Sequence, residues 1–421
     1  MSISYRSRAQ SYTGLSARGW YISLLLAGLI LFPIALGAVG FRLPNQDPEG
    51  IARGNAFAAT ADNPSAIYYN PAGITQLDGQ QFRAGLYLIS ADTKYTSPSG
   101  AKAETDASFQ PVPQLYYVNS LKNLPLSFGL GVYAPYGLSL DWGTHAPFRT
   151  LAEKGKLLYA TVNPVVAWQV LPSLSLAIGP TINYSQVEFK RGVGFIPNDL
   201  FIVKGDGWDY GFNAGLMWKP HQMWSFGVNY RHGTEIDYSG HSETSPTAPF
   251  PPYYPSTTTD ASLRFPQFVA GGISFRPTED WNFEFDLDWT DWDHLNETVF
   301  RGTPFHNTPF GDPVFVWNYT SSFMYEFGVT YQLGKGYFAS VGYIYSENSS
   351  PDKNFNPVVP DSNLHLGNLG FGHHGQRWDW AISYTLAYNG GREVKSEANP
   401  LADGTYRTLN NALNLALTLK F

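Results

Sequence analysis

The chain has 421 residues, of which 43% are hydrophobic, 16% are aromatic and only 14% are charged. This composition excludes a disordered chain, which needs low hydrophobicity and high charge. The net charge of −7 argues against a nucleic-acid-binding protein, whose surface carries a basic stripe. The absence of cysteine excludes disulfides, thiolate metal sites and cysteine nucleophiles. Many aromatic and few charged residues together favour a protein whose outer surface faces lipid.

Residues 1–37 have the pattern of a secretory signal peptide. The first part holds three arginines and no acidic residue, and Trp20 to Leu36 then form an apolar run. Small residues at Ala35 and Gly37 stand at positions −3 and −1 of a cleavage site before Ala38. The alternative is an N-terminal membrane anchor, which the short apolar run disfavours because a span needs about 20 residues.

The rest of the chain alternates apolar and polar residues with a period of two. From residue 413 to the terminal Phe421, every second residue is a leucine or phenylalanine, and the same alternation recurs at 208–218, 281–289 and 378–388. Alternate side chains of a strand face opposite sides of a sheet, so these segments predict strands with one apolar face. Aromatics at both ends of the apolar faces indicate interfacial girdles. The alternative is a soluble β-sandwich.

Fourteen such segments are predicted after residue 79. Their approximate spans are 80–90, 108–121, 126–142, 159–170, 174–190, 207–219, 223–240, 261–276, 281–299, 318–333, 337–347, 364–374, 377–389 and 408–421. Short and long connections alternate strictly along the chain, as periplasmic turns and extracellular loops do in bacterial barrels. The sequence therefore predicts an all-β membrane protein, a 14-stranded antiparallel transmembrane β-barrel over residues 80–421. No transmembrane helix is predicted after residue 40.

Residues 38–79 lack this alternation and are predicted to form a small hatch, or plug, inside the barrel. The segment Ile51 to Ala61 is expected to be helical, which would make the hatch partly helical. The dipeptides Asn63-Pro64 and Asn70-Pro71 predict turns. A barrel of this size is wide enough to hold a plug. The alternative is a periplasmic tail, which the apolar content of the segment disfavours.

This N-terminal segment resembles the hatch of the FadL family, outer-membrane channels for long-chain fatty acids and other hydrophobic compounds. The resemblance rests on three motifs in order: Gly40-Phe41-x-Leu43, Ala52-Arg53-Gly54-Asn55-Ala56 and Asn70-Pro71-Ala72. An export signal precedes these motifs, and a barrel ending in Phe421 follows them. Phe421 also resembles the signal that the bacterial barrel-assembly machinery reads. The resemblance extends in outline over the whole mature chain.

The resemblance implies passive uptake across the outer membrane of a Gram-negative-type bacterium. In the family, a hydrophobic ligand docks among apolar extracellular loops and passes to a pocket beside the hatch. The hatch then shifts, and the ligand leaves sideways through a gap made by a kink in the third strand. The resemblance also implies a monomer surrounded by lipid and lipopolysaccharide, and no cofactor is expected. Keeping each CH₂ of a hydrophobic molecule out of water is favourable by about 0.8 kcal/mol, which favours an exit sideways into the membrane.

The third predicted strand breaks its alternation at Ala134, Pro135, Tyr136 and Gly137. Proline cannot donate a ladder hydrogen bond and is confined to edges or bulges. This break lies where the family's kink lies, so these four residues are candidates for the lateral exit. The alternative is an ordinary bulge near the outer rim.

Two predicted loops, residues 193–203 and 248–255, are unusually apolar. The candidate residues for ligand capture in them are Phe195, Ile196, Leu200, Phe201, Phe250 and Tyr253. Large exposed apolar patches usually mark binding sites. The alternative is that the two loops pack on each other as a lid.

A carboxylate ligand would require a cation in the lumen. By parity, Arg231, Arg264 and Arg276 are expected to point inward, as are Glu284, Asp286 and Asp288. Arg231 and Arg264 are the candidate carboxylate contacts. The alternative is a lattice of lumenal salt bridges that stiffens the barrel, so the sequence leaves an acidic or a neutral ligand open.

No metal site and no enzyme activity are predicted. The run from Asp286 to Asp293 lacks the Gly and Glu that a calcium loop requires, and no catalytic or phosphate-binding motif is visible. The rival functions are a general porin and, less favoured, an outer-membrane lipid hydrolase. A structural or adhesive barrel without a saturable ligand is a third alternative.

Overall fold

The computed structural model describes residues 40–106, 109–245 and 256–421. The predicted signal peptide, residues 1–37, lies outside the described residues, as do Phe250 and Tyr253. Among the described residues, no helix has the length and apolar character needed to cross a membrane.

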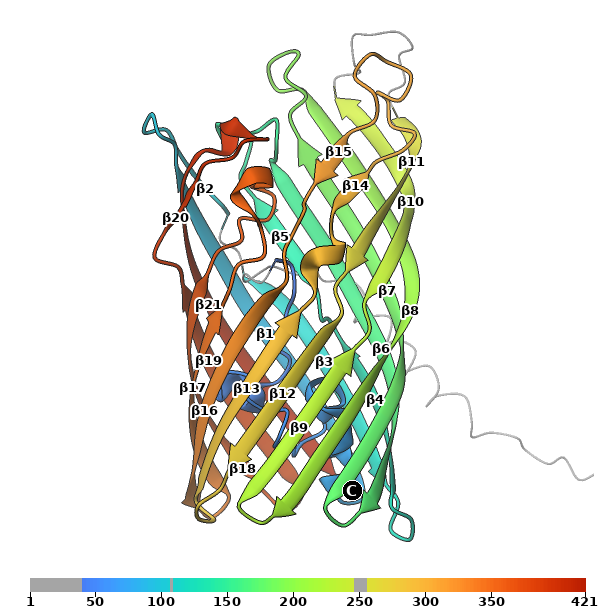
Figure 1. The fold of residues 1–421 in the computed structure, drawn as a ribbon, viewed down its shortest axis with the longest axis vertical. Coiled ribbons are helices and arrows are strands. Elements are labelled where there is room, and N and C mark those ends of the chain that lie inside the picture. The colour runs from blue at the N-terminus through green and yellow to red at the C-terminus, as the bar shows by residue number, and fades with distance from the viewer. Residues whose placement is uncertain (1–39, 107–108, 246–255) are drawn as a thin grey trace, which may run out of the picture. The chain divides into compact units, whose positions relative to one another are not determined.

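The described strands form a closed antiparallel barrel of fourteen passes, as the sequence predicts (Figure 1). The barrel closes where β1 pairs with β21, from Gln81↔Lys420 to Thr96↔Thr405. Its uninterrupted passes are β1 (Gln80–Thr96), β3 (Gln110–Ser120), β6 (Lys154–Leu171), β7 (Leu174–Arg191), β8 (Leu200–His221), β13 (Trp281–Thr290), β16 (Ser322–Gly334), β17 (Tyr337–Ser346), β18 (Leu364–His374), β19 (Trp378–Tyr388) and β21 (Gly404–Lys420).

Three further passes are each split into two strands by a short break. They are β4 (Leu126–Tyr133) with β5 (Gly137–Asp141), β9 (Trp224–Arg231) with β10 (Thr234–Ser245), and β11 (Ser256–Phe265) with β12 (Phe268–Phe275). The short strands β2 (Lys102–Glu104) and β20 (Arg392–Val394) join the same sheet, whereas β14 (Glu297–Val299) and β15 (Val314–Val316) form a separate ribbon.

The outer face of the wall is an apolar belt, as the alternation predicts. Trp208, Tyr210 and Tyr388 are at least half exposed, whereas Asn213 and Asp286, which face the interior of the barrel, are buried. Such a belt is stable in lipid and not in water. Between the described strands, short connections alternate with longer ones, and the short ones are residues 121–125, 172–173, 222–223, 276–280, 335–336 and 375–377.

Residues 40–79, here called the N-terminal segment, are almost entirely buried. They contain α2 (Pro48–Ala52), α3 (Ala66–Tyr69) and the 3₁₀ helix η1 (Pro71–Gln76). Further 3₁₀ turns are η2 (Trp292–His294), η3 (Asp352–Asn354) and η4 (Pro400–Ala402).

The expected helix over Ile51–Ala61 is wrong. Helix α2 begins earlier, where Asp47 accepts a hydrogen bond from the backbone N–H of Glu49 and so caps it. It ends before Gly54 and Asn55, whose φ angles of 65° and 59° a right-handed helix does not allow.

Candidate functional site

An apolar cavity lies on the extracellular side of the lumen. Its volume is about 630 Å³, counting the space open to solvent, and strands β5 to β8, β10 and β11 contribute to its lining. Phe300, Phe315 and Trp317, from the ribbon β14–β15 and its flanks, supply much of the remaining lining. Phe189 and Phe315 meet edge to face with ring centroids 4.4 Å apart. The cavity is suited to an apolar ligand because few polar groups line it.

Phe41 of the N-terminal segment also lines this cavity. Its ring packs edge to face on Trp292, with centroids 4.9 Å apart, and on Phe265, at 5.5 Å. Gly40 lies against the indole of Trp292 so closely that a Cβ at Gly40 would contact it at 2.8 Å. The start of the segment is therefore held between the cavity and η2.

The backbone of the same stretch bonds to the break between β4 and β5. The N–H of Leu43 donates to the C=O of Pro135 at 2.8 Å, and the N–H of Gly137 donates to the C=O of Phe41 at 2.9 Å. Gln46 Nε2 donates to the C=O of Ala134 at 2.7 Å. The predicted break thus lies where the sequence places it, and its backbone groups turn toward the N-terminal segment.

The wall loses its ladder beside this break. Pairing between β3 and β4 ends at Leu115↔Val132. Beyond it, β3 continues to pair with β1, and β5 pairs with β6. The next described backbone bond between the two sides runs from the N–H of Asp106 to the C=O of Asp141, at 2.9 Å. In continued register, Pro111–Pro113 of β3 lie opposite the break at Ala134–Tyr136, and no described ladder joins the two. We call this part of the wall, between β3 and the start of β5, the β3–β5 seam.

Further along, the N-terminal segment is fixed to β13 by carboxylates. Asp286 accepts hydrogen bonds from the backbone N–H groups of Phe57 and Ala58 at 2.9 and 2.7 Å. Glu284 accepts from the N–H groups of Ala59 and Thr60 at 3.0 and 2.9 Å. Both carboxylates therefore orient the backbone of the segment.

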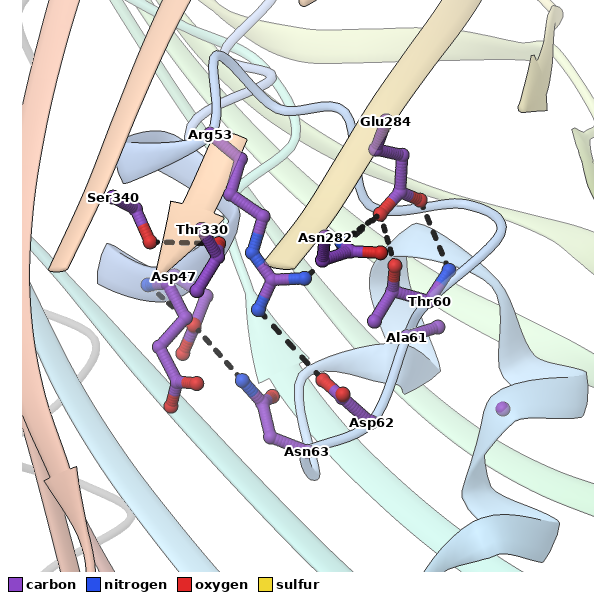
Figure 2. A network of polar contacts seen from close by, with 12 residues as sticks. Asp47, Arg53, Thr60, Ala61, Asp62, Asn63, Asn282, Glu284, Thr330 and Ser340 are labelled. Atoms are coloured by element: carbon purple, nitrogen blue, oxygen red, sulfur yellow. Dashed lines mark hydrogen bonds and ion pairs between the residues drawn. The ribbon is translucent and has the colours of Figure 1, made fainter. Parts of the chain in front are cut away.

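Arg53 of the predicted hatch motif lies between two carboxylates, as Figure 2 shows. Its guanidinium is 3.8 Å from both Asp62 and Glu284. Burial acts to raise the pKa of Asp62, but Arg53 and Arg276 outweigh burial and lower it. Arg276 points inward as expected, and its Nη2 is 3.3 Å from Asp62.

A second set of ion pairs fixes the segment to the opposite wall. Arg83 of β1 donates to Asp47 at 2.5 Å and lies 2.9 Å from Glu49, and Glu49 also meets His374 of β18 at 2.9 Å. Burial acts to raise the pKa of Glu49, but His374 and Arg83 outweigh burial and lower it.

Asn70 of the Asn-Pro-Ala motif fastens η1 to the wall. Its Oδ1 accepts from the N–H of Ala72, and its Nδ2 donates to the C=O groups of Ala58 and Leu216 at 2.7 and 3.0 Å. Pro71 and Ala72 are buried in η1. A Cβ on Gly215 would collide with Asn70, so this glycine permits the close approach.

Arg231 and Arg264, the two candidate carboxylate contacts, lie in different environments in the structure. Arg231 points inward and is 4% exposed. Its guanidinium lies 5.2 Å from the ring of Tyr68, 5.1 Å from Tyr133 and 5.7 Å from Phe268. Among the described residues, its Nε and Nη2 atoms have no hydrogen-bond partner.

The expectation that Arg264 points inward is wrong. Its side chain is 51% exposed and pairs with Glu235 at 3.1 Å. The cause is the break at Pro266–Gln267, which shifts the alternation by one residue: Phe265 is buried before the break and Phe268 after it. A one-residue shift moves every side chain to the other face.

The first apolar loop is shorter than expected, because β8 begins at Leu200. Leu200 and Phe201 therefore belong to a strand, and Phe201 is fully buried against Phe305 at 5.3 Å. Phe195 and Ile196 remain in the loop and are 36% and 43% exposed. Phe195 packs on Phe310 of the neighbouring long loop at 4.9 Å.

The aromatic residues around β14 and β15 were not among the residues selected from the sequence. The prediction placed Phe300 at the start of a long loop, and Phe315 and Trp317 at its end. No local pattern in the sequence distinguishes them from other loop aromatics. Within the described ranges, no group of three or more His, Cys, Asp or Glu is placed to hold a metal.

A closed barrel with an apolar outer belt and a buried internal segment defines a plugged transmembrane β-barrel of the bacterial outer membrane. A family model described as "Outer membrane protein transport protein (OMPP1/FadL/TodX)" matches residues 33–420. The chain therefore belongs to this family of outer-membrane transport proteins, and the resemblance inferred from its motifs is confirmed.

Individual relatives are distant but cover nearly the whole chain. The chain is 21% identical over 414 residues to a long-chain fatty acid transport protein of Escherichia coli, covering 89% of this chain and 92% of the relative. It is 22% identical over 448 residues to outer membrane protein P1 of Haemophilus influenzae, covering 93% and 95%.

Two solved structures show the same fold. A Pseudomonas aeruginosa FadL homologue matches with a TM-score of 0.78 at 18% identity, covering 91% of this chain and 100% of that one. The Pseudomonas putida toluene transporter TodX matches with a TM-score of 0.67 at 16% identity, covering 85% and 94%.

Proposed function

We propose that this protein is a passive uptake channel for hydrophobic small molecules, either long-chain fatty acids or aromatic or aliphatic hydrocarbons. The observation that carries the proposal is the double role of Phe41. Its ring lines the apolar cavity, and its backbone C=O bonds to Gly137 at the break in the wall. One residue thus connects the place where a ligand binds to the place where it would leave.

In the proposed route, the exposed apolar residues of the outer loops capture the ligand. Phe195 and Ile196 are the loop residues among the described ones that remain candidates for this step. The ligand then enters the cavity and contacts Phe41. The N-terminal segment acts as a hatch, and movement of its first residues gives access to the β3–β5 seam.

The ligand leaves sideways through this seam into the membrane. Each CH₂ kept out of water contributes about 0.8 kcal/mol, so a long alkyl chain strongly favours an exit into lipid. The missing ladder at this seam supports the exit, because a paired wall would have to break hydrogen bonds in a medium that cannot replace them.

Arg231 bears on whether the ligand is acidic or neutral. A buried guanidinium with two unpartnered nitrogens favours a carboxylate that completes its hydrogen bonds. The nearly apolar cavity favours a hydrocarbon tail. Relatives are named for both classes, one as a long-chain fatty acid transport protein and one as a toluene transporter.

The decisive experiment is binding of oleate and of toluene to the purified, refolded protein, by competition against one fluorescent hydrophobic reporter. The variants are Arg231→Gln and, as a matched control, Arg264→Gln, whose side chain faces outward. Oleate binding that weakens in the first variant alone identifies an acidic ligand bound at Arg231. Equal toluene binding by both variants and the unmodified protein, without oleate binding, identifies a hydrocarbon channel.

Saturable binding of neither probe by a folded barrel contradicts the proposal. Steady ion conductance in planar bilayers would then favour a general porin, and hydrolysis of a chromogenic ester would favour a lipid hydrolase.

A further inference from the structure

Strand β3 carries two prolines, Pro111 and Pro113, in the stretch that borders the seam. The side of the strand that each proline nitrogen faces follows from the backbone hydrogen bonds at the other end of β3. The N–H of Ser120 donates to Gly79, just before β1, and the N–H of Leu121 donates to Leu126 of β4. Successive backbone N–H groups of a strand point to opposite neighbours.

The register between β1 and β3 is continuous from Asn119 to Gln110, so this alternation persists along the strand. Even-numbered residues of β3 therefore direct their N–H groups toward β1, and odd-numbered residues direct theirs toward β4 and β5. The nitrogens of Pro111 and Pro113 consequently face the seam. Proline has no N–H, so neither residue can donate across it.

The N–H groups missing from Pro111 and Pro113 can be compared with the donors that the residues opposite them use instead. Continuing the register beyond Leu115↔Val132 would place Pro113 opposite Ala134 and Pro111 opposite Tyr136. The C=O of Ala134 would then need a donor from residue 113. It accepts instead from Gln46 Nε2, at 2.7 Å. The N-terminal segment thus supplies a hydrogen bond that β3 cannot.

We propose that Pro111 and Pro113 are positioning residues that keep β3 from pairing across the seam with Ala134–Tyr136. This inference rests on the proposed sideways exit. When Gln46 moves, the carbonyl of Ala134 loses its donor, and an unpaired carbonyl in lipid requires a new partner. In a strand with N–H groups at positions 113 and 111, these groups would donate to Ala134 and Tyr136 and close the seam. The two prolines prevent this, so the route stays open while the ligand passes.

The test restores the donors with Pro111→Val and Pro113→Val together, valine being favoured in strands. The matched control is Pro164→Val with Pro180→Val. These residues lie where the β6–β7 ladder is interrupted between Val162↔Ile182 and Val166↔Ile178. Two readouts are needed: a crystal structure of each variant, and uptake of radiolabelled oleate and toluene by cells that carry the full-length protein. If the double variant does not fold, the single variant Pro113→Val is tested in its place.

We expect β3 to pair with Ala134–Tyr136 in the Pro111/Pro113 variant and uptake to fall by about tenfold, the effect of one or two added hydrogen bonds. The control variant should retain uptake. A seam that stays unpaired in the variant overturns the inference and leaves the sideways exit standing. A paired seam with undiminished uptake supports the role of the prolines in the wall but overturns the sideways exit itself.

Discussion

Arg42 of the N-terminal segment and Asp288 of β13 form a buried, two-point ion pair. Arg42 Nη1 donates to Asp288 Oδ1 at 2.7 Å, and Nη2 donates to Oδ2 at 2.6 Å. Both side chains are at most 5% exposed. A bidentate pair fixes orientation as well as distance. Because Arg42 lies between Phe41 and Leu43, the pair holds the residues that connect the cavity to the seam.

Replacing Arg42 by Met should lower the free energy of unfolding by about 3–5 kcal/mol, because Asp288 would remain buried without its partner. Adding Asp288→Leu should restore much of the loss, since the pair is then replaced by apolar groups. Urea unfolding in lipid vesicles measures both effects. A double variant no more stable than Arg42→Met would contradict this account of the pair.

Phe41→Ala should weaken ligand binding by about tenfold, since a cavity wall loses most of a buried aromatic side chain, worth on the order of 1.5–3 kcal/mol. Competition binding with oleate and toluene measures the change. Leu369→Ala is the control, because Leu369 is 61% exposed on the lipid-facing surface. Equal affinities in the two variants would remove Phe41 from the binding site.

The loop residues Phe195 and Phe310 should matter for capture and not for folding. The variant Phe195→Ser with Phe310→Ser removes an exposed aromatic contact with ring centroids 4.9 Å apart. Uptake should fall at low ligand concentration and recover at high concentration, because capture limits the rate only when ligand is scarce. Phe201→Ser is unsuitable for this purpose, since Phe201 is fully buried. Unchanged uptake at every concentration would exclude these loops from the route.

The break at Pro135 and Gly137 should be required for exit but not for binding. Pro135→Val with Gly137→Val favours a regular strand. We expect ligand binding to persist and cellular uptake to be lost. Both are measured on the same folded variant. Normal uptake would mean that the break is an ordinary bulge.

The loop that precedes β8 should open in acid. Burial acts to raise the pKa of Asp199, but hydrogen bonds from the N–H groups of residues 193–196 outweigh burial and hold this pKa below its ordinary value. The resulting stabilisation is present above the ordinary pKa of about 4 and is lost as the pH falls through the lowered value. Pepsin cleavage of this loop should therefore increase below about pH 4.

Asp199→Asn is the control for this pH effect, because its amide cannot titrate. Its loop should be cleaved with little dependence on pH. A wild-type loop equally resistant across the acid range would show that Asp199 does not order it.

The wall was predictable because its signal is local. Alternation with a period of two identifies each strand and its lipid-facing side without knowledge of its neighbours. The alternation misassigns side chains where a break in the strand shifts it by one residue. His232 and Gly233 separate β9 from β10, and Pro266 and Gln267 separate β11 from β12. A parity argument carried across Pro266 misplaced Arg264 for this reason.

The interior was only partly predictable, because its contacts join residues far apart in the sequence. The motif around Arg53 marked the segment, but no local pattern indicates that Asp286 binds the backbone of Phe57 and Ala58. The prolines of β3 were visible in the sequence. Their importance depends on which side of the strand each nitrogen faces, and only the register reveals that.

Glycines of the wall place limits on how the interior can rearrange. A Cβ on Gly227 would collide with the backbone of Ala58, and one on Gly328 or Gly342 would collide with Arg53 or Gly54. Main chain therefore rests directly on main chain over this part of the plug, with no side chains between them to deform. The movement proposed above is confined to the first few residues of the segment and would leave this main-chain contact intact.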